Sequence, residues 1–284
     1  MPTRTTFDSN VGDKLFALSD ADRHALFAAF RDHRFSFYLT GEVFEETLCL
    51  AETSYATQLL PGQARWLLNL LSFGRFLADW REISAKEVAG NRSPFASAKI
   101  ASTVRSVLKE LAAGRIEPVV KTMAMDARKR KEANVASYRE LQDIVRDIKA
   151  AKSRTKASRI TFDEFRDEYW ARRGREIVLR FLREGGAKDP ESRVDGVLKN
   201  LGRYPYTQTH MTVHVAILWR YYVDDRRVHE GDVHDAGLLV QMVGLDVLVS
   251  DDKALRETFP LIHSSPKRIL TFDEFMAEVR RSPS

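Results

Sequence analysis

The pattern of apolar and polar positions predicts alternating strands and helices near the amino terminus. A β-prone run at residues 5–7 stops at an Asp-Ser-Asn cluster, and apolar residues then recur at helical spacing over 11–33. Residues 35–40 predict a second strand, and 41–51 a further helix. This β-α-β-α order is typical of a parallel sheet with helices on its faces.

A helix-to-strand unit near the carboxyl terminus predicts more of the same sheet. Acidic residues within 232–235 precede an apolar helix, which ends at a glycine. Residues 246–249 then predict a short buried strand. Ser250, Asp251 and Asp252 follow directly at the end of that strand. Open α/β sheets bind ligands outside the carboxyl ends of their strands, so these carboxylates lie where chemistry is expected.

Strand signals largely stop between about residues 56 and 227, where apolar residues recur at helical spacing. Helices are predicted at 64–80, 82–88, 97–113 and 211–223, and a last short strand at 267–271 precedes a terminal helix. We therefore expect an α/β domain in two parts, separated by a mainly helical insertion with a basic segment, with bounds 1–55, 56–205 and 206–284.

Two segments share the sequence Thr-Phe-Asp-Glu, at residues 161–164 and 271–274. Each has the spacing of a capping box, with Thr at the cap and Glu three residues later. The similarity is explained by two helix starts, and no internal repeat is predicted.

Composition indicates a globular protein. The chain has 284 residues, 44% of them hydrophobic, which is enough for one large or two ordinary domains. No signal sequence is recognisable at the amino terminus, and no run of about 18 apolar residues occurs, so we expect a cytoplasmic protein without membrane association. Cys49 is the only cysteine, which excludes a disulfide framework within one chain and fits a reducing compartment.

Positive charge is concentrated in one segment. Residues 101–160 contain 15 Lys and Arg against 7 Asp and Glu, a surplus of 15 − 7 = +8, and the whole chain has +5, which leaves 5 − 8 = −3 elsewhere. A basic run within it consists of Arg128, Lys129, Arg130 and Lys131. Such a distribution suits a protein that holds a polyanion with one part and cations with another, although a solvated helical face has the same signature.

Four acidic residues occupy comparable places in the predicted elements. Asp8 ends the first strand, Glu46 lies on the helix after the second, Asp235 lies at a helix start, and Asp252 follows a later strand. Their order and settings resemble those of the PIN domain, a small metal-dependent nuclease fold.

The resemblance is carried by four motifs and covers about residues 4–55 and 210–280. Phe7-Asp8-Ser9-Asn10-Val11 resembles the family's opening strand, and Tyr38-Leu39-Thr40-Gly41-Glu42-Val43-Phe44-Glu45-Glu46-Thr47-Leu48 its second strand and helix. Asp232-Val233-His234-Asp235-Ala236 is similar to the helix start with the third acid, and Val249-Ser250-Asp251-Asp252-Lys253 to the motif with the fourth. Residues 56–205 have no counterpart in the minimal domain.

The resemblance implies a three-layer α-β-α fold and a hydrolase that cleaves RNA phosphodiester bonds. Mg²⁺ or Mn²⁺ would be held by Asp8, Glu46, Asp235 and Asp252, with Asp232 and Asp251 as auxiliary ligands. Hard divalent cations take oxygen ligands and are usually shared between a few carboxylates and substrate phosphate. A cation held in this way activates water as the nucleophile, so no covalent intermediate with the protein is expected.

Several alternatives stay open at this point. Asp8 is also suited to cap the helix near Val11, Glu42 and Glu45 compete with Glu46, and Asp232 is also suited to cap the helix of Asp235. Asn10 and Ser250 are candidates for nucleic-acid contacts, although such residues more often bond to nearby backbone.

The histidines favour packing over zinc binding. His210, His214, His229 and His234 are close in sequence but lack a metal-site pattern such as His-Glu-x-x-His. His210 and His214 share an apolar helix face, where packed histidines are the commoner finding.

RNA is favoured over DNA as the partner, and the basic run is expected to help hold it. The rival interpretations are a structure-specific DNA nuclease and an inactive module that binds nucleic acid or protein. A homo-oligomer and an inhibitory protein partner stay open.

Overall fold

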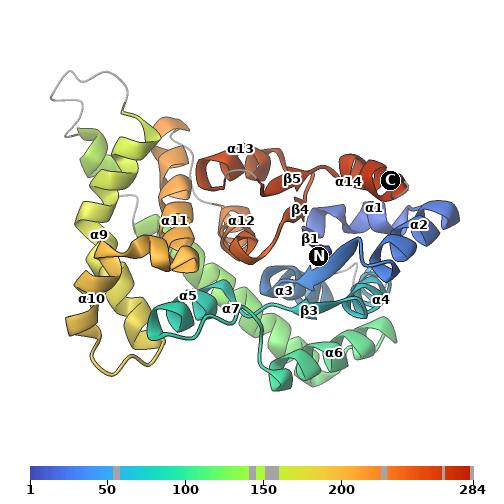
Figure 1. The fold of residues 1–284 in the computed structure, drawn as a ribbon. Helices are drawn as coiled ribbons and strands as arrows, with labels where there is room; N and C mark the ends of the chain where they lie inside the picture. The colour runs from blue at the N-terminus through green and yellow to red at the C-terminus, as the bar shows by residue number, and fades with distance from the viewer. Residues whose placement is uncertain (54–57, 141–144, 151–159, 225–228, 264–265, 282–284) are drawn as a thin grey trace. The chain divides into compact units, whose positions relative to one another are not determined.

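The computed structural model describes residues 1–53, 58–140, 145–150, 160–224, 229–263 and 266–281 (Figure 1). It divides into two compact units, each assembled from segments that are distant in sequence. The first unit comprises residues 1–79, 94–128 and 244–284, and the second comprises 80–93 and 129–243. The expected parts had other bounds: 56–79 and 94–128 belong to the unit that contains both ends of the chain, and 206–243 to the other unit.

The first unit contains a five-stranded, all-parallel sheet with the order β3-β2-β1-β4-β5. The strands are β1 (Thr3–Phe7), β2 (Phe35–Leu39), β3 (Gly74–Phe76), β4 (Val247–Val249) and β5 (Arg268–Leu270). Helices flank the sheet, which confirms the predicted α/β class with a central parallel sheet and is consistent with three α-β-α layers. Along the chain, β2 and β3 are added on one side of β1, whereas β4 and β5 are added on its other side. The strand order therefore reverses between β1 and β4.

Apolar helix faces cover this sheet. Phe7 and Phe35 both contact Phe275, with ring centroids 5.2 and 5.1 Å away, and Phe30 packs against Phe35 at 6.2 Å. These contacts place α14 and α2 on the same sheet face. The helices of the first unit are α1 (Gly12–Phe16), α2 (Asp20–Arg31), α3 (Gly41–Cys49), α4 (Leu60–Leu71), α6 (Ala98–Ala112), α13 (Lys253–Ile262) and α14 (Phe272–Arg280), with short 3-10 turns at Ser9–Val11 and Leu50–Glu52.

Strand β3 corrects the prediction of one helix over 64–80. The helix α4 ends at Leu71, and Gly74 pairs with Phe37 of β2. A Cβ atom at Gly74 would lie 1.5 Å from the Phe37 carbonyl oxygen, so only glycine allows the two backbones to approach this closely. The apolar spacing continues through this strand, which explains why the pattern predicted a helix.

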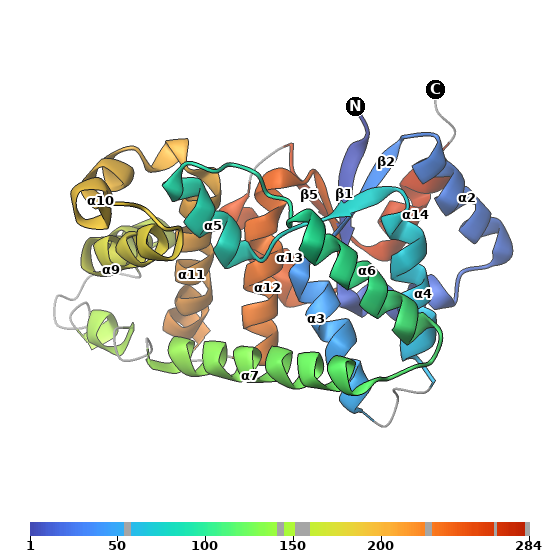
Figure 2. The same ribbon diagram turned by 90° about the horizontal axis from the view of Figure 1, so that it is seen from below.

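The second unit is helical. It contains α5 (Trp80–Ala89), α9 (Phe162–Glu184), α10 (Pro190–Lys199), α11 (Pro205–Asp224), α12 (Glu230–Gln241) and, from residue 129 onward, the rest of α7 (Pro118–Glu140). A helical segment at 145–150 and a 3-10 turn at Leu201–Arg203 complete it, and a further 3-10 turn at Met242–Gly244 begins in this unit and ends with the first residue of the segment 244–284. Figure 2 shows α5, α9, α10 and α11 side by side, around a core that includes Val88, Val178, Phe181, Val194 and Met211.

A buried carboxylate joins α5 to α11. Glu87 accepts hydrogen bonds from the backbone N–H groups of Tyr206 (3.2 Å) and Thr207 (2.8 Å), which are orphan donors at the start of α11. Burial raises the pKa of Glu87, and these hydrogen bonds oppose the rise. The segment 80–93 is therefore attached to residues more than 100 positions later in the chain.

Both predicted capping boxes are present. Thr161 and Thr271 accept from the N–H groups of Glu164 (3.3 Å) and Glu274 (3.2 Å), and each Glu carboxylate accepts from the Thr N–H at 2.7 Å. The two similar segments are therefore the starts of α9 and α14. Within the part of the chain that the structure describes, no helix is long and apolar enough to cross a lipid bilayer.

Candidate functional site

Asp8 and Glu46 lie together at the carboxyl edge of the sheet. Asp8 follows β1, and its N–H donates to the Val249 carbonyl oxygen of β4 at 2.9 Å, so the residue sits where the strand order reverses. Glu46 lies on α3, the helix that follows β2. A carboxylate oxygen of Asp8 and one of Glu46 lie within 4.8 Å of each other. The crevice at such a reversal is the usual ligand site of open α/β sheets.

Local sequence explains how α3 presents Glu46. Thr40 caps the helix by accepting from the Val43 N–H at 3.3 Å, directly after β2 ends at Leu39. Val43, Phe44, Thr47 and Leu48 are buried, which sets the rotation of the helix. Glu46 is half-buried and adjacent to Asp8, whereas Glu42 is buried one turn earlier and Glu45 is half-buried. The geometry therefore singles out Glu46 among the three glutamates as the partner of Asp8.

The Ser9 hydroxyl lies between the two carboxylates. It donates a hydrogen bond to Glu46 Oε2, and its oxygen is 3.4 Å from Asp8 Oδ1. The sequence pattern did not predict this role. The signal was present, because Ser9 begins a 3-10 turn directly after Asp8 and its side chain must stay near the strand end.

A chain of hydrogen bonds orients Asp8. The Ser250 hydroxyl donates to Asp8 Oδ2 at 2.7 Å, and the Asn10 side-chain amide donates to Ser250 Oγ at 3.2 Å. Ser250 is fully buried and Asp8 is 5% exposed. Asn10 and Ser250, which we expected to contact nucleic acid, thus have side chains engaged in positioning the Asp8 carboxylate.

Asp251 and Asp252 bind neighbouring helices. Asp252 Oδ1 accepts from the Leu255 N–H at 2.9 Å and caps α13, while Asp251 Oδ1 accepts from the Phe272 N–H at 3.1 Å. Asp251 Oδ2 forms an ion pair with Lys14 at 3.1 Å. Among the described residues, neither aspartate joins Asp8 and Glu46 in a group whose ligand atoms all lie within 4.8 Å.

Asp232 and Asp235 lie in the second unit, on α12. The Asp232 carboxylate accepts from the His229 N–H at 2.7 Å, so it caps the helix start, an alternative that the sequence left open. Asp235 is half-buried one turn further along.

The basic run lies on α7. Arg128, Lys129 and Arg130 are exposed and Lys131 is half-buried, so most of the run is accessible to a polyanion. Residues 141–144 and 151–159 of the basic segment lie outside the described residues.

His210 and His214 pack among aromatic rings. His210 contacts Trp80 and Phe181 at 4.3 and 4.5 Å between ring centroids, and one ring nitrogen is 3.0 Å from Ser84 Oγ. His214 lies 4.6 Å from Tyr138. Burial lowers the pKa of His210 well below its usual value and that of His214 to about 3. Both are neutral and packed among aromatic rings, as the sequence pattern favoured.

Comparisons of the chain with protein-family models, with curated proteins and with solved structures found no match. The resemblance to the PIN domain therefore stays a prediction that rests on the motif residues.

The donor atoms at the site suit a hard divalent cation. The two carboxylates within 4.8 Å and the adjacent Ser9 hydroxyl supply oxygen ligands, which Mg²⁺ and Mn²⁺ prefer. Two neighbouring carboxylates also repel each other when both are ionised, and a bound cation relieves this repulsion. The residues present thus fit such an ion.

Proposed function

We propose that this chain is a metal-dependent nuclease that hydrolyses RNA. The observation that carries the proposal is the pairing of Asp8 and Glu46, within 4.8 Å, at the carboxyl edge of a parallel sheet where the strand order reverses. An acid pair at this place is suited to bind Mg²⁺ or Mn²⁺ together with a phosphate group.

Each residue has a defined part in this proposal. Asp8 and Glu46 would hold the cation, and Ser250 with Asn10 keeps the Asp8 carboxylate in one orientation. Ser9 holds Glu46 toward Asp8 through its hydroxyl group. When bound, the cation supplies an activated water and neutralises charge that develops on the phosphate.

RNA is preferred to DNA because of the resemblance to the PIN domain, and the surplus of +8 over residues 101–160 supports a polyanionic substrate of either kind. The acid pair itself does not distinguish the two sugars. Both nucleic acids therefore belong in the test.

The test is cleavage of end-labelled generic RNA and DNA by the full chain, with Mn²⁺ or Mg²⁺ and with EDTA. We expect metal-dependent cleavage of RNA that Asp8→Asn and Glu46→Gln each reduce by more than about 100-fold, in line with the loss of a group that stabilises transition-state charge. Glu45→Gln is the matched control, because it removes the same charge from the adjacent position of α3 and should leave cleavage intact. Cleavage at the parent rate by folded Asp8→Asn and Glu46→Gln, or no cleavage of either nucleic acid with either metal, contradicts the proposal.

A further inference from the structure

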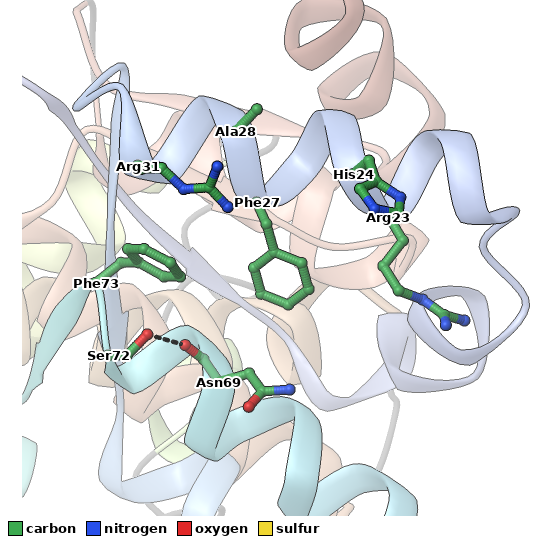
Figure 3. Close-up of a pocket in the computed structure, with 8 residues that line it drawn as sticks. All are labelled: Arg23, His24, Phe27, Ala28, Arg31, Asn69, Ser72 and Phe73. Atoms are coloured by element: carbon green, nitrogen blue, oxygen red, sulfur yellow. Dashed lines mark hydrogen bonds between the residues drawn. The ribbon is translucent and has the colours of Figure 1, made fainter.

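A groove of about 540 Å³ runs between α2 and α4 of the first unit. Figure 3 shows its lining residues, which come from α2 and from the end of α4: Arg23, His24, Phe27, Ala28, Arg31, Asn69, Ser72 and Phe73. A second hollow of about 240 Å³ shares Arg23, Phe27 and Asn69 with it and adds Phe16, Gly62, Arg65 and Trp66. The two hollows thus lie next to each other along both helices, and they are together called the groove.

Aromatic rings form the floor of this groove. Phe27 and Trp66 are stacked nearly parallel, with centroids 5.3 Å apart and an interplanar angle of 11°, and Phe73 lies 6.1 Å from Phe27. All three side chains are half-buried, so part of each ring faces the groove. Aromatic rings on a surface are platforms on which nucleic-acid bases stack.

The charged residues of the lining are all cationic. Arg23, Arg31 and Arg65 line the groove together with His24, and the lining residues include no Asp or Glu. The Arg23 guanidinium lies 5.8 Å from the centre of the Trp66 ring, and Arg65 donates to the Ala112 carbonyl oxygen at 3.3 Å. Arg31 is exposed, and its guanidinium has no ion pair or side-chain hydrogen bond with the described residues. Arginine binds phosphate through a fork of N–H donors.

The groove leads away from the candidate site along the helices. Phe16 and Gly62 lie at the end of α1 and the start of α4, on the side of the sheet where β1 and β2 end. Arg31 and Phe73 lie just before β2 and β3 begin, at the opposite edge. Each helix has 12 residues and is therefore about 18 Å long, which accommodates about five stacked nucleotides at ~3.4 Å each.

We propose that this groove binds single-stranded nucleic acid, with bases on Phe27, Trp66 and Phe73 and phosphates on Arg23, Arg31 and Arg65. A single strand is favoured over an acidic peptide because the cations alternate with stacked rings, and over a duplex because paired bases cannot reach those rings. The inference rests on the proposed function only in that the strand would be the substrate. Binding itself needs neither metal nor cleavage.

The test is fluorescence anisotropy of a labelled 12-nucleotide RNA in EDTA, so that binding is measured without cleavage. We expect the double variant Arg31→Gln, Arg65→Gln to lose RNA affinity by at least about tenfold. The slope of the logarithm of the association constant against the logarithm of the salt concentration should become less steep by about 1.4, since each phosphate contact on a single strand contributes about 0.7. Trp66→Leu should weaken binding about tenfold at unchanged salt slope, because it removes a stacking surface without removing charge.

The control variant Arg203→Gln, Arg256→Gln removes the same charge from exposed positions outside the groove and should bind as the parent does. Because binding is measured in EDTA, loss of affinity in the Arg31→Gln, Arg65→Gln variant supports the groove even if the parent cleaves neither nucleic acid, which separates failure of the groove from failure of the nuclease proposal. Unchanged affinity and salt slope in the Arg31→Gln, Arg65→Gln variant would overturn the inference. So would equally strong binding of a labelled oligoglutamate of matched charge that loses affinity in the same variant, because the occupant would then be an acidic peptide.

Discussion

Acidification from pH 7 to pH 5 is predicted to destabilise the second unit through His210. This side chain is 3% exposed, between Trp80 and Phe181, and burial lowers its pKa well below 6.5. Above pH 6.5 the histidine is neutral in both the folded and the unfolded chain, and its contribution does not change with pH. Below pH 6.5 the unfolded chain takes up a proton that the folded unit excludes, so the free energy of unfolding falls until the folded pKa is reached.

The size of this effect follows from the proton that the buried His210 excludes. One pH unit corresponds to about 1.4 kcal/mol per proton, so a histidine that stays neutral in the folded unit down to pH 5 removes about 2 kcal/mol between pH 7 and pH 5. His214, whose pKa burial lowers to about 3, is also neutral in the folded unit throughout this range and adds to the loss. A loss of this size is a large share of the 5–15 kcal/mol that stabilises a typical domain.

Urea unfolding followed by circular dichroism at pH 7 and pH 5 measures the effect. Other groups titrate in every variant, so the quantity compared is the loss between the two pH values. We expect His210→Asn to be less stable than the parent at pH 7 but to show a loss smaller by about 2 kcal/mol. Equal losses in His210→Asn and the parent would refute the reasoning.

Three further predictions concern the sheet, a helix cap and the basic run. Gly74→Ala should destabilise the first unit by about 3 kcal/mol in urea titrations, because the added Cβ would lie 1.5 Å from the Phe37 carbonyl oxygen. Gly196→Ala is the control: its added Cβ has no neighbouring atom within 4 Å, so it should be neutral or stabilising. Thr271→Ala should cost about 1 kcal/mol by removing the cap of α14, and no change in the urea midpoint would contradict this. Replacing Arg128, Lys129, Arg130 and Lys131 by Ala should weaken RNA binding and make the affinity less dependent on salt, without changing the cleavage rate at saturating RNA. If affinity and its salt dependence equal those of the parent, the basic run does not contact RNA and is only a solvated helix face.

The strands were predictable where apolar, β-prone runs were bounded by turn residues. β1, β2, β4 and β5 all occur at such runs, and their helices follow at the expected places. β3 was not predictable, because its three residues continue an apolar helical pattern and its formation depends on a backbone contact between Gly74 and Phe37. Local patterns do not encode contacts of this kind.

The sequence predicted the division into two units less well than it predicted the helices and strands. Glu87 binds the start of α11, and Arg193 donates to the Val88 carbonyl oxygen at 2.7 Å, so partners over 100 residues apart hold the second unit together. The expected insertion bounds relied on where strand signals stop, and those signals do not report which helices pack on one another.

The sequence predicted part of the candidate site. Asp8 and Glu46 each follow a strand of the same parallel sheet, so their proximity follows from the predicted elements. Whether an Asp binds a ligand or caps a helix depends on a few dihedral angles, and Asp252 and Asp232 both accept a backbone N–H near a helix start. The bridging position of Ser9 depends on the turn after β1, which the pattern did not specify.

The central claim is that Asp8 and Glu46 together hold a divalent cation. Electron paramagnetic resonance of Mn²⁺ titrated into the full chain tests it directly, because free Mn²⁺ has a sharp spectrum that is lost on binding. The account predicts stoichiometric binding to the parent and to Glu45→Gln, and loss of that binding in Asp8→Asn and in Glu46→Gln, with all variants folded by circular dichroism. Equal Mn²⁺ binding by the parent, Asp8→Asn and Glu46→Gln would contradict it.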